Sequence, residues 1–229
     1  MKKSLLVAAV AISALFAGGA AMAQDTAGAL SYNLALTSNY VWRGISQTAE
    51  NPALQGGLDY KKGTFYAGAW ASNVDFGKDS VGDNLASTEL DLYLGVTPTW
   101  GNYSFDFGAI AYTYPSQSKE ADLNVGELKA AVSHPMGAGT IGASFYLPTK
   151  QLEDPYYEVN ASYPLTDKFS VSGAIGNWEL EGANYTNANI GVTYAINDTL
   201  SLDVRATNAS KGYDGTEHSY VLATLKAGF

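Results

Sequence analysis

The sequence of 229 residues contains no cysteine, so neither a disulfide nor thiol chemistry is available to it. Charged residues make up only 15% of the chain and are unbalanced, with 13 Lys and Arg against 22 Asp and Glu. A chain this acidic is a poor match for nucleic acid, which is bound by basic surfaces. Two distant histidines are a weak basis for a metal site. We therefore expect no nucleic acid, no metal and no disulfide framework.

Long apolar runs are missing beyond the first residues. A positive start, a short apolar stretch and the small residues Ala21-Met22-Ala23 indicate a cleaved secretory signal peptide over residues 1–23. No other stretch approaches the ~18 apolar residues of a transmembrane helix. Removal of the signal peptide leaves 11 Lys and Arg against 22 acidic residues, a net charge of −11. Residues 24–229 show no linker or shift in composition, and we expect them to form one exported domain.

Glycine (24) and tyrosine (16) are abundant, which is typical of all-β proteins. Apolar and polar residues alternate along many runs, the period of a half-buried strand. In the first run Leu30, Leu34 and Leu36 share one face, and Asn33 lies on the other. The sequence predicts about twelve strands: Leu30–Val41, Ala53–Tyr60, Phe65–Val74, Thr88–Val96, Tyr103–Thr113, Gly126–Ser133, Thr140–Leu147, Tyr156–Tyr163, Phe169–Gly176, Ala188–Tyr194, Leu200–Thr207 and His218–Phe229.

The connections between these runs alternate in length. Short ones rich in Gly, Pro, Asn or Asp, such as 61–64 and 165–168, are followed by longer polar ones, such as 77–86 and 177–185. A soluble sandwich has Greek-key connections with no reason to alternate. Tight periplasmic turns and long outer loops are instead typical of outer-membrane barrels. The predicted fold is therefore a transmembrane antiparallel up-and-down β-barrel in the outer membrane of a Gram-negative bacterium, surrounded by its lipid.

The last run ends on Phe229, with Val221 and Leu225 on the same apolar face. This ending resembles the C-terminal signal of bacterial outer-membrane barrels. A sheet that spans a bilayer must close on itself, because no water is present to satisfy unpaired backbone groups. The last run is therefore expected to pair with Leu30–Val41. We interpret Phe229 as the barrel-closing residue and as a signal read by the barrel-assembly machinery.

Charged residues within the runs fall on the polar face. A basic residue facing lipid would cost about 2–4 kcal/mol near the midplane, whereas a wet lumen accepts it. The predicted pore-lining residues are Asp59, Glu89, Asp91, Asp106, Glu127, Glu158 and Asp203, with Arg43, Lys129, Arg205 and Lys226. Seven acids against four bases predict a mild preference for cations if the lumen conducts. An internal salt-bridge network that fills the barrel is the alternative interpretation.

Aromatic residues gather where runs meet connections, as in the girdles of membrane barrels. The predicted girdle comprises Tyr60, Phe65, Trp100, Tyr103, Tyr163, Phe169, Tyr194 and Phe229 at the turn side, with Tyr40, Trp42, Tyr157 and Trp178 at the opposite rim. The block Tyr40-Val41-Trp42-Arg43 has two interpretations. It is part of this girdle with a structural ion pair, or Arg43 points inward and faces the acids in a constriction like those of porins.

Two further patterns bear on cofactor binding and catalysis. The three glycines of Gly137–Gly142 match a dinucleotide-binding pattern, but no helix is predicted to follow them, so no cofactor is expected. His218 lies close in sequence to Asp214 and Glu217, which leaves open an acid–histidine site of an outer-membrane hydrolase. A solvated loop is the favoured interpretation. We therefore predict no catalytic residues and no enzymatic activity.

Four segments, Ser38–Thr48, Pro52–Tyr60, Tyr66–Phe76 and Glu89–Tyr93, resemble the TorF family, proteobacterial outer-membrane proteins classed as porins. The resemblance extends over essentially the whole mature chain and is densest in these segments. It implies an outer-membrane barrel and supplies no catalytic or binding residue. The favoured function is a passive channel for small hydrophilic solutes or ions. A non-conducting barrel with a structural or surface-binding role is the alternative.

Overall fold

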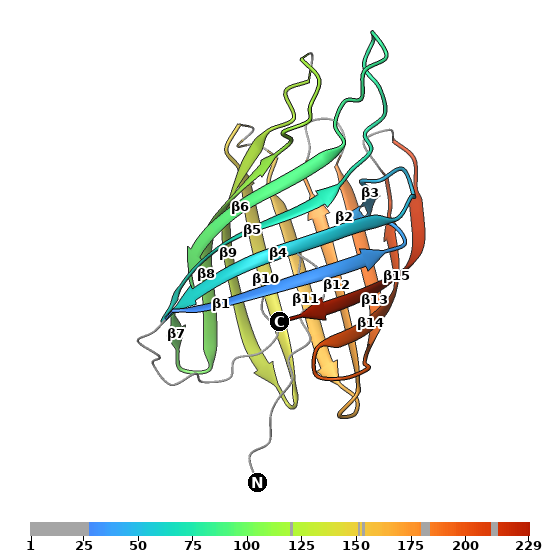
Figure 1. The fold of residues 1–229 in the computed structure, drawn as a ribbon. Helices are drawn as coiled ribbons and strands as arrows, with labels where there is room; N and C mark the ends of the chain where they lie inside the picture. Colours follow the sequence, from blue (N-terminus) through green and yellow to red (C-terminus); the bar gives the residue numbers. More distant parts are fainter. Residues whose placement is uncertain (1–27, 120, 151, 153, 180–183, 212–214) are drawn as a thin grey trace.

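The computed structural model describes residues 28–119, 121–150, 152, 154–179, 184–211 and 215–229, and the expected signal peptide, residues 1–23, lies outside this part. Twelve long strands close into one antiparallel barrel (Figure 1). They are β1 (Ala29–Thr37), β4 (Ala53–Lys62), β5 (Phe65–Asn73), β6 (Thr88–Val96), β8 (Tyr103–Thr113), β9 (Val125–Met136), β10 (Gly139–Pro148), β11 (Tyr156–Pro164), β12 (Phe169–Trp178), β13 (Tyr185–Ala195), β14 (Leu200–Ala209) and β15 (His218–Gly228). The predicted fold is confirmed.

Closure of the barrel joins the two ends of the described chain. β1 pairs with β15, and the backbones of Tyr32 and Phe229 exchange two hydrogen bonds, of 3.0 and 2.9 Å. Phe229 thus extends the closing ladder beyond the last residue of β15. The predicted pairing of the last run with the first is confirmed, whereas the role of Phe229 as an assembly signal stays a prediction.

The strands alternate between an apolar outside and a polar inside. On β1 the outward Leu34 and Leu36 are each 55% exposed, whereas Ala35 and Thr37 between and beside them are buried. The same alternation continues around the ring, and it is the reverse of a soluble protein, whose apolar residues lie inside. Large exposed apolar side chains on the outer surface include Leu58, Leu92, Leu94, Phe107, Val159, Ile175, Ile190, Val204 and Val221.

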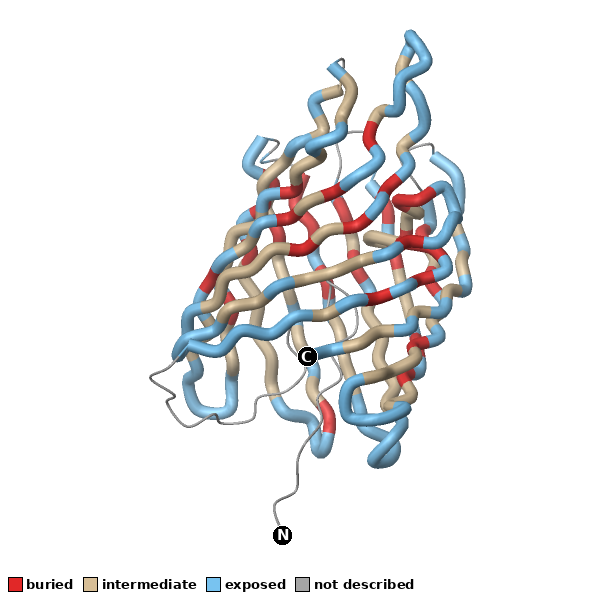
Figure 2. The backbone as a smooth tube through the Cα atoms, viewed as in Figure 1, coloured by how far each residue is buried: buried red, intermediate tan, exposed pale blue. Residues whose placement is uncertain are grey.

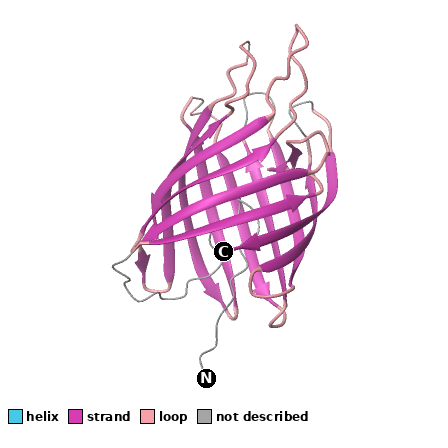
Figure 3. Cartoon of the chain, in the orientation of Figure 1, coloured by secondary structure: helices cyan, strands magenta, loops and turns pink. Residues whose placement is uncertain are grey.

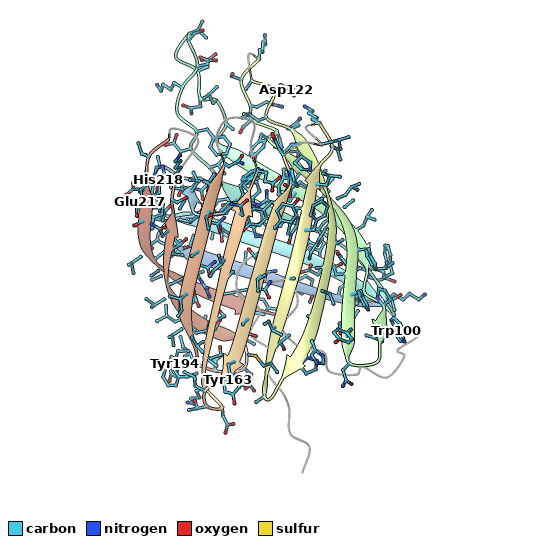
Figure 4. The ribbon with its side chains drawn as sticks, turned by 180° about the vertical axis from the view of Figure 1, so that it is seen from behind. Trp100, Asp122, Tyr163, Tyr194, Glu217 and His218 are labelled. Carbon is cyan, nitrogen blue, oxygen red and sulfur yellow. The ribbon has the colours of Figure 1, made fainter. Side chains whose placement is uncertain are left out.

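The two ends of the barrel differ. Trp100, Tyr163 and Tyr194 lie at the end with the tight turns, here named the turn end, and Asp122, Glu217 and His218 lie at the opposite loop end (Figure 4). Buried residues gather in the half of the barrel nearer the loop end (Figure 2). The regular structure of the described residues is strand (Figure 3), and none of it is a helix long and apolar enough to cross a membrane.

Three short strands lie outside the ring of twelve. β7 (Thr99–Trp100) extends the turn before β8, and β2 (Val41–Trp42) pairs with β3 (Ile45–Ser46) inside the first long loop. The expected run Leu30–Val41 was therefore too long. β1 ends at Thr37, whose hydroxyl donates to the carbonyl of Asn39, and the chain then leaves the wall.

Candidate functional site: a loop hairpin bound across the lumen

The first long loop folds into the barrel as a hairpin. Its two turn residues, Arg43 and Gly44, have φ angles of 47° and 84°. Positive φ at both central positions is the signature of the type I′ turns that connect twisted two-stranded hairpins. The second position carries the usual glycine, but the first carries an arginine, for which this conformation is costly. A strained residue of this kind persists where surrounding contacts fix it.

The tip of this hairpin touches the wall formed by β13 and β14. A methyl group added at Gly44 would lie 2.8 Å from Cβ of Ala209 and 3.0 Å from Cβ of Asn187, closer than such atoms pack. Gly44 is therefore required twice, by its φ angle and by the lack of space. The loop leaves β1 and returns to β4, so contact with Asn187 places its tip well inside the lumen.

Arg43 extends from the tip to β9. Its two terminal nitrogens donate to the two carboxylate oxygens of Glu127, both at 2.8 Å, in a bidentate ion pair. The side chains of Arg43 and Glu127 are 4% and 2% exposed. Tyr112 of β8 donates a further hydrogen bond of 3.0 Å to the same carboxylate. Three strands, β5, β6 and β8, separate β4 from β9 around the ring, so the ion pair crosses the barrel.

Four aromatic rings surround the guanidinium group. Its central carbon lies 4.0 Å from the ring centre of Tyr156, 4.3 Å from Trp42, 4.4 Å from Trp178 and 5.1 Å from Tyr146. At such distances a cation is attracted by the negative face of each ring. Glu127 and these rings, from β10, β11, β12 and the hairpin itself, are here named the Arg43 cage. A permanently charged group is thus almost fully enclosed by protein atoms.

Two of the other predicted lumen bases also bind carboxylates. Lys129 lies 2.5 Å from Asp106 on the neighbouring strand β8. Arg205 binds Asp203 of its own strand at 3.1 Å and donates to Asn189 and Ser172. The alternative interpretation of an internal salt-bridge network therefore has structural support at three places, including Arg43. Whether these groups line a conducting pore stays a prediction.

The remaining predicted acids accept hydrogen bonds from neutral groups or stand apart. Asp59 accepts from the hydroxyl of Tyr93 at 2.6 Å, and Glu158 accepts from that of Tyr156 at 3.0 Å. Lys226 is half-buried and interacts electrostatically with Asp59. Glu89 and Asp91, on the lumen face of β6, are both buried, and Glu89 accepts a hydrogen bond of 3.3 Å from the hydroxyl of Tyr114.

The aromatic girdle was predicted correctly at the turn end and only in part at the loop end, where Tyr157 is exposed. At the turn end the rings of Trp100, Phe169 and Phe229 are exposed, as expected for a girdle. At the loop end Tyr40 and Trp178 are instead buried in the lumen, where Trp178 packs 5.0 Å from Trp42. Trp42 and Trp178 pack against Arg43, and Tyr40 packs against Trp70. Lumen walls and membrane rims both suit an aromatic ring with one polar edge, so the sequence pattern is the same in the two places.

Sequence reasoning missed the cage tyrosines. Tyr146 and Tyr156 received no role, although Tyr156 precedes Glu158 by two positions and therefore shares its lumen face. Residues two positions from a strand carboxylate share its face, so this spacing identifies further lumen-facing residues. The correct partner of Arg43 could not be found in this way, because it lies 84 positions away.

The acid–histidine site that the sequence left open as an alternative places His218 against two hydroxyl groups in the structure. The ring nitrogens of His218 lie 3.0 Å from the hydroxyl of Tyr220 and 3.4 Å from that of Thr216. Glu217 accepts a hydrogen bond from Asn208 at 2.9 Å. Asp214 lies outside the described residues. The described part of the chain also contains no group of three or more acidic or histidine side chains arranged for a metal ion.

A family model described as a bacterial protein of unknown function (Gcw_chp) matches residues 21–229, and no curated protein matches the chain. The KdgM porin is similar in structure with a TM-score of 0.61 at 8% identity, over 89% of this chain and 99% of that one. The NanC porin gives 0.53 at 8% identity, over 88% and 99%. An outer membrane channel from Pseudomonas putida F1 gives 0.52 at 11% identity, over 88% and 94%.

At such identities the similarity establishes the fold, which is that of outer-membrane β-barrels. The expectation of a porin-like barrel is confirmed at this level. The TorF name is not confirmed, since the matching family has no assigned function.

Proposed function

The chain belongs to the Gcw_chp family of bacterial proteins of unknown function, and we propose that it is a channel of the Gram-negative outer membrane for small hydrophilic solutes or ions. The observation that carries the proposal is a closed barrel with an apolar outside and a charged inside. Lipid covers the outer leucines and valines at no cost, whereas the charges suit water-soluble solutes. The similarity to the KdgM and NanC porins supports the same class of function.

The charges of the lumen favour cations in this proposal. Seven acids and four bases are expected inside, and three of the acids are neutralised by the ion pairs of Arg43, Lys129 and Arg205. Asp59, Glu89, Asp91 and Glu158 remain against Lys226. The KdgM porin has been described in complex with oligogalacturonate, a polyanion. A lumen with excess negative charge attracts the opposite sign, so we do not extend that ligand to this chain.

The hairpin with Arg43 forms the constriction of the proposed channel. It crosses from the β1–β4 side to β9 and removes part of the cross-section at the loop end. Glu89 and Asp91 lie buried in the wall on the β6 side of this constriction. Half-buried polar residues, such as Asn160, Ser172 and Asn189, line the lumen beyond it.

Planar-bilayer recording of the refolded protein tests this function. We expect unitary current steps and, with unequal KCl on the two sides, a reversal potential displaced towards that of potassium. A reversal potential near zero or on the chloride side contradicts the cation preference, and an absence of steps contradicts the channel.

A non-conducting barrel is the second candidate, favoured by the depth to which the hairpin enters the lumen. Under this alternative the Arg43 cage closes the barrel, which then acts as a structural or surface-binding protein. Gly44→Ala separates the two candidates, because the added methyl group pushes the tip off Ala209 and Asn187. Steps that are absent from the wild type and present in this variant identify the hairpin as a plug.

Export and insertion complete the proposal. Residues 1–23 would direct secretion, and the barrel-assembly machinery would bind the last strand with Phe229 before closure. The exposed ring of Phe229 lies on the outer face, where such a partner can reach it.

A further inference from the structure

Two buried carboxylates of the lumen, those of Glu89 and Asp91, form no ion pair with any side chain in the described part of the chain. Glu89 and Asp91 lie two positions apart on the same face of β6 and are 3% and 2% exposed. Oε1 of Glu89 accepts a hydrogen bond of 3.3 Å from the hydroxyl of Tyr114, whereas Oε2 of Glu89 and Oδ1 of Asp91 accept none from any described group. An unsatisfied buried carboxylate oxygen is costly, and a cation or a donor is what removes that cost.

Aromatic rings line the wall on both sides of this pair. Asp91 is in register with Trp70 of β5 and with Tyr112 of β8. Tyr40 packs edge-on against Trp70 at 5.4 Å between ring centres, and electrostatic interactions connect it to both carboxylates. All three rings are buried. The carboxylate pair therefore lies among three aromatic side chains.

The Arg43 cage shows what such a combination binds in this barrel. There a carboxylate and four rings hold a guanidinium group, and Tyr112 donates to that carboxylate. The wall at Glu89 and Asp91 repeats the components, carboxylates and rings, with Tyr112 shared between the two places. It differs in having two carboxylates and no arginine.

We propose that Glu89 and Asp91, with Tyr40, Trp70 and Tyr112, bind the ammonium or guanidinium group of a small organic cation. A calcium ion is a poorer match, because it takes six to eight oxygen ligands, and no metal-binding group of three acidic or histidine side chains exists among the described residues. Rings add attraction for an organic cation that they do not offer to a strongly hydrated metal ion. The inference deepens the proposed function, on which it rests, by naming the class of solute.

Calorimetric titration of the refolded protein with methylguanidinium chloride tests the site without requiring conductance. Potassium chloride and calcium chloride are titrated alongside. We expect saturable binding of methylguanidinium. The affinity should be weaker by about tenfold or more in Asp91→Asn and in Glu89→Gln, as for loss of a charge-assisted hydrogen bond. Asp59→Asn is the matched control, since Asp59 is a lumen acid satisfied by Tyr93, and its binding should equal that of the wild type.

Several outcomes overturn the site. One is a wild type without saturable binding, and another is equal affinity for potassium or calcium. A third is unchanged affinity in folded Asp91→Asn, with folding judged by heat-modifiable mobility on gels. The wild-type arm decides even where a variant fails to fold. Binding without current steps in a bilayer contradicts the channel and leaves the site, whereas current steps without binding do the reverse.

Discussion

Two arginines inside the barrel each bind a carboxylate, yet they connect different things. Arg43 lies in the first loop and binds Glu127, which is 84 positions away on the far wall. Arg205 binds Asp203 of its own strand, two positions away. The first ion pair holds a loop inside the lumen, and loops are in general more mobile than strands. The second joins two residues that the strand already holds together.

The surroundings of the two guanidinium groups differ as well. Arg43 is enclosed by rings, and Glu127 is its carboxylate partner. Arg205 also donates to Asn189 at 2.5 Å and to Ser172 at 2.8 Å, which remain if Asp203 is lost. A count of the lumen charges therefore does not show how much each ion pair stabilises the barrel. That depends on which segments the ion pair joins and on whether the remaining charged group keeps other partners.

Glu127→Gln tests the comparison with the largest expected effect. Removing one partner of a buried ion pair leaves an uncompensated charge, which typically costs about 3–5 kcal/mol. We expect a loss of this size in the free energy of unfolding, measured by urea titration, together with a several-fold rise in conductance. Asp203→Asn is the matched control and should lose much less. Equal losses in the two variants contradict the distinction between the arginines.

Arg43→Lys keeps the charge and removes the planar fork. Lysine cannot make the bidentate contact with Glu127 or stack as a plane on Trp42 and Tyr156. We expect a loss of about 2 kcal/mol in the free energy of unfolding, near the strength of one hydrogen bond to a charged group. Noisy, fluctuating current steps should accompany it. A lysine variant as stable as the wild type would show that charge alone holds the hairpin.

Gly44→Ala weakens the contact of the hairpin tip with the wall and leaves both Arg43 and Glu127 in place. The substitution combines an unfavourable positive φ with a clash against Ala209, and we expect a loss of about 1–2 kcal/mol with increased conductance. Gly63→Ala is the control, because Gly63 has a φ of 59° and nothing within 4 Å of the added methyl group. It should lose stability without a change in conductance. A rise in conductance in both variants attributes the effect to backbone strain.

Arg205→Gln has the smallest expected effect. Asp203 still accepts a hydrogen bond of 2.8 Å from Thr193 after the substitution, so we expect a loss of about 1 kcal/mol, well below that of Glu127→Gln. Conductance should stay close to that of the wild type, while the reversal potential moves further towards cations because a positive charge is removed. Bilayer recording in unequal KCl measures both. A conductance change as large as that of Glu127→Gln makes the two arginines equivalent.

The barrel could be predicted from the sequence because alternation is a local property. Leu34 and Leu36 against Ala35 and Thr37 give the burial of β1 within a few residues. The hairpin could not be predicted in the same way, since the contact of Arg43 with Glu127 exists only in the closed barrel. Trp42 was placed in a girdle because an aromatic residue at a rim has the same local signal whether it faces lipid or lumen.

The Arg43 cage has a consequence for the order in which the hairpin and the barrel wall form. Its hairpin is made early in the chain, between β1 and β4, but the groups that hold it come from β8 to β14. Contacts between distant segments carry a loop-closure entropy cost, which falls once the chain between them has been organised. The strained turn at Arg43 therefore lacks its stabilising contacts until β8 to β14 have formed. Enclosure of Trp42 by Trp178 and Tyr112 requires both β8 and β12 to be in place. The enclosed Trp42 side chain is thus an internal marker of a finished barrel.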